Sequence, residues 1–134
     1  MTIATSDTYI HYLSKSYAGK LHDYALLKEE FPIEKNWFKK FTIRVDLGFL
    51  GFLKDYTCKK LVIPEKKKKK QELTDAQKIS NKKKSQKRIY VEHSIGGMKR
   101  YRILSDRSRT HDLELYDDIV LICAGLWNFN ITHK

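Results

Sequence analysis

Short segments in which apolar residues are β-branched or aromatic, or alternate with polar ones, occur in several parts of the chain, and such segments are typical of β-strands. Residues 2–5 and 9–13 are rich in β-branched and aromatic side chains, and the polar residues 6–8 between them predict a tight turn, hence a hairpin. Residues 41–45 alternate apolar and polar residues, and residues 61–63 form a short apolar run. We expect the hairpin and the two further strands to lie in one sheet.

Two segments have the start signals of helices. Asp23 is placed to cap a helix over residues 24–30, because aspartate is a preferred N-cap residue. Thr74 and Gln77 have the spacing of a capping box, which predicts a helix that begins at Asp75.

The second of these helices is expected to continue through Glu92 towards Tyr101. Residues 80–88 have no apolar face, so we expect that part to be exposed. Gly96 and Gly97 indicate either a weak point of the helix or a site of close packing.

The clearest helical pattern lies near the C-terminus, where Thr110 is placed to cap a helix. Apolar residues then recur every three or four positions, at Leu113, Tyr116, Ile119, Val120, Cys123, Leu126 and Trp127. Leu115 and Ile122 widen this stripe, so we expect the helix to be largely buried. Because strands and helices alternate along the chain, the pattern favours an α/β or α+β fold.

Positive charge is concentrated in one segment. The 134 residues include 27 Lys and Arg against 16 Asp and Glu, for a formal net charge of +11. Residues 59–102 carry a net charge of +12, whereas the rest of the chain carries −1. A phosphate backbone is the natural partner of such a charge density. The alternative is a solvated, partly disordered lysine loop.

Composition and motifs exclude several classes of protein. A hydrophobic content of 41% is too high for a fully disordered chain. No apolar run approaches the roughly 20 residues that span a bilayer, and the N-terminus lacks the pattern of a signal peptide. Cys58 and Cys123 have no CxxC spacing, so we expect a reducing cytoplasm rather than a disulfide scaffold or a cysteine zinc site.

Asp46 stands where a predicted strand ends and a glycine-containing turn begins. A carboxylate at this position projects from the edge of the sheet, and Gly48 and Gly51 let a ligand or another backbone approach closely. The alternative is an aspartate that only caps the turn.

Glu92 lies within the most basic part of the chain. On a helix, Arg88 lies one turn before Glu92 and Lys99 lies two turns after it, so the three share a face. Carboxylates that hold a divalent metal bind phosphate and activate water or a 3′-hydroxyl. The alternative is an Arg–Glu pair on a solvated helix.

These residues resemble motifs of the DDE transposases of bacterial insertion sequences. The pattern R-x3-E-x6-K, formed by Arg88, Glu92 and Lys99, resembles the signature around the third acid of that family. Ser85 stands where the family usually has a tyrosine. The segment 46–51 resembles the D-x-G-[YF]-x-G motif around the second acid.

Two further segments complete the resemblance. Residues 19–23 are similar to a G-x-x-H-D motif that precedes the second acid, and residues 126–128 are similar to the closing helix of the same domain. The four segments occur in the family's order over nearly the whole chain.

The resemblance implies an α/β fold of the ribonuclease H-like class, a mixed sheet flanked by helices. It implies a site with two Mg²⁺ (or Mn²⁺) ions, in which Asp46 and Glu92 are catalytic residues and metal ligands. Such enzymes hydrolyse the phosphodiester at transposon ends and join the freed 3′-hydroxyl to target DNA. Arg88 and Lys99 are then DNA contacts. The basic stretch, an exposed insertion over residues 65–88, follows the DNA backbone with Lys66, Lys67, Lys68, Lys69 and Lys70.

The first acid of the family has no clear counterpart here. Asp7 lies in the predicted hairpin turn, and Asp23 fits the H-D motif. Residues 1–134 are therefore interpreted as the C-terminal part of a transposase catalytic domain without its first strand. We expect it to be inactive alone, to act in a prokaryotic cytoplasm on the nucleoid with no membrane partner, and to pair with an upstream segment or a second copy.

A different class of function competes with this one, a non-catalytic, basic nucleic-acid-binding protein. The discriminating feature is geometric, since Asp46 and Glu92 must converge in an enzyme. The aromatic residues Trp37, Phe38 and Phe41 suit either base stacking or core packing, with core packing as the default expectation.

Overall fold

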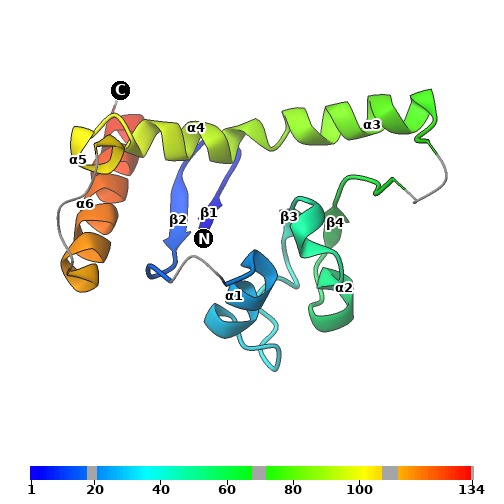
Figure 1. Cartoon of the computed structure of the whole chain (residues 1–134), viewed down its shortest axis with the longest axis horizontal. Coiled ribbons are helices and arrows are strands. Elements are labelled where there is room, and N and C mark those ends of the chain that lie inside the picture. Colours follow the sequence, from blue (N-terminus) through cyan, green and yellow to red (C-terminus); the bar gives the residue numbers. More distant parts are fainter. Residues whose placement is uncertain (18–20, 68–71, 107–111, 134) are drawn as a thin grey trace. The chain divides into compact units, whose positions relative to one another are not determined.

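The computed structural model describes residues 1–17, 21–67, 72–106 and 112–133 (Figure 1). The chain forms two compact units, Met1–Ala18 with Ile89–Lys134 as the first and Gly19–Arg88 as the second. Each unit has its own pair of strands and its own group of buried apolar side chains.

The first unit opens with the predicted hairpin. Strand β1 (Thr2–Ala4) pairs antiparallel with β2 (Ile10–Leu13), and the register shifts between Ile3 and Ala4. In the turn, Thr8 adopts a left-handed conformation with φ of 67°. The hairpin prediction is confirmed.

Three helices complete the first unit, α4 (Ile89–Met98), α5 (Arg102–Ser105) and α6 (Leu113–Thr132). Figure 1 shows α4 passing over one end of the hairpin. The buried cluster between these elements consists of Ile10, Met98, Ala124 and Trp127. Among the described residues, no helix has the length and apolar content to cross a membrane.

Close packing of α4 on α6 depends on Gly97. A Cβ at this position would lie 2.4 Å from a ring carbon of Trp127, whereas a Cβ on Gly96 would meet open space. The helix continues through both glycines, so the close-packing interpretation holds at Gly97.

Two predictions about α6 are wrong. Asp112 is the N-cap residue, since its Oδ1 accepts hydrogen bonds from the backbone N–H groups of Glu114 (3.0 Å) and Leu115 (3.1 Å); Thr110 lies outside the described residues. The helix is also not largely buried, because Leu115 and Ile122 are 50% and 62% exposed. Among the described residues, α4 and β2 contact α6, and the buried residues of the helix are Cys123, Ala124 and Trp127.

The second unit contains the remaining elements. Helix α1 (Asp23–Glu30) is followed by β3 (Thr42–Arg44), the 3₁₀ helix η1 (Leu47–Phe49) and α2 (Phe52–Asp55). Strand β4 (Lys60–Val62) and helix α3 (Asp75–Gln86) complete it. Strands β3 and β4 pair in parallel, with Thr42 opposite Lys60. Both strands lie within a residue of their predicted bounds.

Aromatic side chains form the core of the second unit. Phe38 lies 5.3–5.5 Å, between ring centroids, from three other rings, which belong to Phe31, Phe52 and Tyr56. The Tyr56 hydroxyl donates a hydrogen bond to the carbonyl oxygen of Phe31 at 2.6 Å, so its one polar group is satisfied. Phe38 is therefore a core residue.

The capping box at the start of α3 is confirmed. Thr74 Oγ1 accepts from the Gln77 N–H at 3.3 Å, and Gln77 Oε1 accepts from the Thr74 N–H at 2.9 Å. At α1 the prediction is wrong, because His22 occupies the N-cap position and Asp23 is the first helical residue. There its charge faces the positive end of the helix dipole.

The helix expected from Asp75 towards Tyr101 is interrupted. α3 ends at Gln86, and a turn at Lys87 and Arg88 separates it from α4. No residue of α3 is buried, so little tertiary packing supports this lysine-rich helix.

The fold is mixed α/β, as predicted, but the described strands form two two-stranded sheets instead of one. β1 and β2 pack on α4 and α6, whereas β3 and β4 pair with each other in the unit whose core is aromatic. β2 contributes the buried Ile10 to the core of the first unit, whereas the apolar residues of β3 and β4 are only partly buried.

Candidate functional site

Asp46 follows β3 and has two partners within its unit. Its Oδ1 accepts a hydrogen bond from the Gly48 N–H at 2.9 Å, so the carboxylate caps η1. Its Oδ2 lies 3.3 Å from Nη1 of Arg88, and the two side chains are 44% and 40% exposed. The Asp46 carboxylate therefore both caps η1 and forms an ion pair with Arg88.

The two glycines after Asp46, Gly48 and Gly51, are explained by the local structure. A Cβ on Gly48 would lie 3.0 Å from Oδ1 of Asp46, so glycine leaves room for the cap. Gly51 has φ of +104°, which favours glycine, and it starts α2. The D-x-G-[YF]-x-G pattern is thus a strand end, a capped 3₁₀ turn and a left-handed helix start.

Glu92 lies in the first turn of α4 and is exposed. Lys99 directly follows α4, and its N–H donates to the Ile95 carbonyl at 3.0 Å, which extends the last turn. Arg88 is not on this helix, since it lies in the preceding turn and pairs with Asp46. The expected common helical face of Arg88, Glu92 and Lys99 is therefore wrong for Arg88.

The two candidate acids belong to different units, Asp46 to the second and Glu92 to the first. Among the described residues, no three His, Cys, Asp or Glu side chains are grouped closely enough to hold a metal ion. Carboxylates are the donors that Mg²⁺ prefers, so the chemistry of the two acids fits. To bind a metal ion through both carboxylate oxygens, Asp46 would have to break its ion pair with Arg88.

Lysines cover much of α3. Two of them lie near acids, with Lys78 Nζ 3.2 Å from Asp75 Oδ1 and Lys84 Nζ 3.8 Å from Glu65 Oε1. Lys82, Lys83 and Lys87 are exposed and have no carboxylate partner in the part of the chain that the structure describes.

The chain that leads into the lysine run lies against α3. Asn81 accepts from the Glu65 N–H at 2.8 Å and donates to the Glu65 carbonyl at 3.0 Å. Lys66 and Lys67 are exposed, and Lys67 Nζ lies 3.4 Å from Glu72 Oε1. Lys68, Lys69 and Lys70 lie outside the described residues.

The conspicuous residues of α6 have structural roles that sequence analysis missed. Asn128 Oδ1 accepts from the Ile10 N–H at 2.9 Å, and its Nδ2 donates to the Ile10 carbonyl at 2.8 Å. The side-chain amide thus bonds to the backbone of β2 as a neighbouring strand would. The Trp127 indole N–H and the buried Ser94 hydroxyl both donate to the Thr8 carbonyl, at 3.0 and 2.9 Å. No local pattern indicates these contacts across more than 80 positions.

An acid in the second unit has a perturbed pKa. Asp55 Oδ2 lies 2.5 Å from Lys28 Nζ and accepts a 2.5 Å hydrogen bond from the Tyr24 hydroxyl. These bonds hold the pKa of Asp55 below its ordinary value. Burial, and then the bond to Asp55, raises the pKa of Tyr24. The cluster connects α1 to α2 and is structural.

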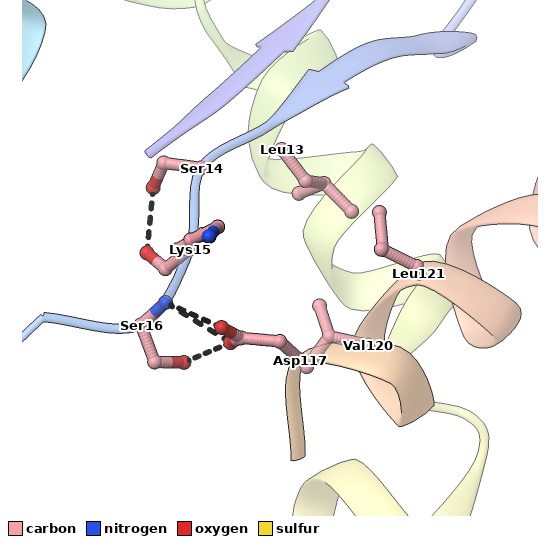
Figure 2. A pocket seen from close by; sticks show the side chains of 7 residues that line it. All are labelled: Leu13, Ser14, Lys15, Ser16, Asp117, Val120 and Leu121. Atoms are coloured by element: carbon pink, nitrogen blue, oxygen red, sulfur yellow. Dashed lines mark hydrogen bonds between the residues drawn. The ribbon is translucent and has the colours of Figure 1, made fainter. Parts of the chain in front are cut away.

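A small hollow in the first unit is also structural (Figure 2). Its volume is about 70 Å³, far below the several hundred Å³ of a typical ligand site. Asp117 accepts hydrogen bonds there from the Ser16 hydroxyl at 2.6 Å and from the Ser16 N–H at 3.0 Å. These bonds fix the chain after β2 to α6.

One comparison with known protein families gives a match that extends over both units. A sequence model described as DDE superfamily endonuclease matches residues 1–128. No curated protein and no solved structure gives a significant match. The matched span includes Asp46, Arg88, Glu92 and Lys99.

Proposed function

Because the chain belongs to the DDE superfamily endonuclease family, we propose that it functions in DNA transposition. The reaction is hydrolysis of the phosphodiester at transposon ends, followed by joining of the 3′-hydroxyl to target DNA. The family match over residues 1–128 carries this proposal. It is supported by the place of Asp46, after the carboxyl end of a strand in a parallel pair, where open α/β sheets bind their ligands.

In this proposal the domain is ribonuclease H-like, and Asp46 and Glu92 are ligands of two divalent ions, Mg²⁺ or Mn²⁺. Such ions, when bound, stabilise charge on the phosphate and lower the pKa of a coordinated water. The bond from the Gly48 N–H orients the Asp46 carboxylate. Arg88 leaves Asp46 and contacts a DNA phosphate, and Lys99 contacts DNA from the end of α4.

DNA is held by the lysines of α3 together with the run Lys66–Lys70. The three exposed lysines without a carboxylate partner among the described residues, Lys82, Lys83 and Lys87, support this role. An upstream segment supplies the remaining acid and the first strand. The element is an insertion sequence, and the protein acts on DNA in a prokaryotic cytoplasm.

Cleavage of transposon-end DNA tests the proposal. The chain alone with Mn²⁺ is expected not to cleave, and the chain joined to its upstream segment is expected to cleave. Asp46→Asn and Glu92→Gln should each abolish cleavage and change duplex affinity by less than about twofold, because they remove metal ligands and leave the lysines. Asp75→Asn, at an acid exposed on α3, is the control and should cleave normally. Full cleavage by the Glu92→Gln fusion would refute the assignment.

The second candidate is a non-catalytic DNA-binding protein. It is favoured by the ion pair of Asp46 with Arg88 and by the absence of a three-residue metal cluster among the described side chains. Tight duplex binding without cleavage in any fusion would support this candidate.

A further inference from the structure

A second group of lysines forms where β3 and β4 begin. The Lys59 N–H donates to the Phe41 carbonyl at 3.0 Å, and the next pair in the register is Thr42 with Lys60. This pairing places Lys59 and Lys60 against Phe41 and Thr42, the two residues that directly follow Lys39 and Lys40 in the chain. The two lysine pairs are about twenty positions apart in sequence, and the parallel pairing brings their chain segments together.

The four lysines have charge available for a ligand. All are exposed, and no carboxylate in the described ranges forms an ion pair with any of them. Lys78 and Lys84, in contrast, each lie close to an acid.

Phe41 directly follows Lys40 and pairs through its backbone with Lys59, and its side chain is 58% exposed. The neighbouring aromatic residues are used by the fold, since Phe38 is buried and the Trp37 indole N–H donates to the Pro32 carbonyl at 3.0 Å. Trp37 also packs edge-on against Phe31, with a centroid distance of 5.4 Å. Phe41 takes part in no ring contact among the described residues, so a face of its ring is available.

Phe41 and the four lysines lie apart from the candidate metal ligand Asp46. Phe41 precedes β3, whereas Asp46 follows it, so the two lie beyond opposite ends of the same strand. Phe41 and the four lysines therefore do not belong to the Asp46 site.

We propose that Phe41, Lys39, Lys40, Lys59 and Lys60 bind single-stranded DNA, with the Phe41 ring stacked on an unpaired base. Ammonium groups around an exposed ring are the combination that such binding requires, because cations attract the backbone and every base offers a face for stacking. The bases of an intact duplex are stacked on each other and do not offer this face. The inference rests on the proposed action on DNA and adds a strand-selective surface to it.

Fluorescence anisotropy with a labelled oligothymidylate and with a duplex of equal length tests this surface. Phe41→Ala should weaken single-strand binding about tenfold and change duplex binding by less than twofold. Phe129→Ala is the matched control, because Phe129 is 59% exposed and lies on α6 in the other unit; it should change neither affinity. Phe41→Trp should retain single-strand affinity, and its fluorescence should be quenched on binding.

Three other results would overturn the inference. Unchanged single-strand affinity of Phe41→Ala, or an equal loss for both DNA forms, overturns the inference. Duplex binding without any single-strand binding also overturns it. Failure of the wild-type chain to bind either form overturns the proposed function as well. Circular dichroism of Phe41→Ala checks that its loss of binding is not loss of fold, and Phe41→Leu, which keeps an apolar side chain without a ring, should lose single-strand affinity in the same way.

Discussion

At the scale of single residues, the pair of Asp46 and Arg88 connects local structure to function. The guanidinium nitrogen Nη1 of Arg88 lies 3.3 Å from Oδ2 of Asp46, an oxygen that the proposed metal site would use. Both side chains are more than a third exposed, so their attraction is weak, about 1 kcal/mol or less. In the proposed site, a divalent ion that displaced Arg88 from Asp46 would lose only this small attraction.

Arg88→Ala is expected to raise the affinity of the chain for Mn²⁺ by up to about fivefold, because the competing cation is removed. Titration calorimetry measures this change. Lys87→Ala is the control, since it removes a neighbouring positive charge that has no carboxylate partner in the described part of the chain. An equal effect of both substitutions would show that general charge, and not displacement of Arg88, controls the affinity.

The bonds to Asp55 predict a pH dependence of stability. Its pKa in the folded chain lies below the ordinary value, so its contribution is fully present above that value and is lost as pH falls through the folded pKa. Asp55→Asn should therefore lower the free energy of unfolding at pH 7, and the difference from wild type should shrink in acid. Urea unfolding at several pH values measures this. A difference that is constant from pH 7 to acid would contradict the assignment.

At the scale of elements, the packing of α4 against α6 rests on one glycine. Gly97→Ala should destabilise the chain by about 1–3 kcal/mol, because its Cβ would overlap the Trp127 ring. Gly96→Ala, one residue earlier in open space, should stabilise it by up to about 1 kcal/mol through helix propensity. Thermal unfolding of both variants provides the comparison, and equal effects would reject this packing.

Local patterns predicted the hairpin, both short strands and the capping box of Thr74, because each depends on neighbouring residues. The burial of α6 was not predictable in the same way, since an apolar stripe does not show how many elements will cover it. Leu115 and Ile122 are apolar and exposed. Asp46 and Arg88 are far apart in sequence, so their ion pair could not be predicted from the sequence. The sequence pattern indicated separate roles instead, a metal ligand for Asp46 and a DNA contact for Arg88.

At the scale of the whole molecule, the charge distribution predicts how the chain binds DNA. If about six phosphates are neutralised, the logarithm of the duplex affinity should fall with the logarithm of salt concentration with a slope near −5. Replacement of Lys82, Lys83 and Lys87 by Gln should make the slope shallower by about 3. Anisotropy titrations at several salt concentrations measure both. A flat salt dependence would reject phosphate contacts as the source of affinity.

The central claim is the proposal that Asp46 and Glu92 are both ligands of divalent metal ions. Paramagnetic broadening of amide signals by Mn²⁺ tests it most directly, in the full chain with and without its upstream segment. The account predicts that substoichiometric Mn²⁺ broadens the signals of Gly48 and His93 together in the joined protein, and that Glu92→Gln weakens both effects. Broadening near Gly48 that leaves His93 sharp, or no selective broadening at all, would contradict the assignment of both acids as metal ligands.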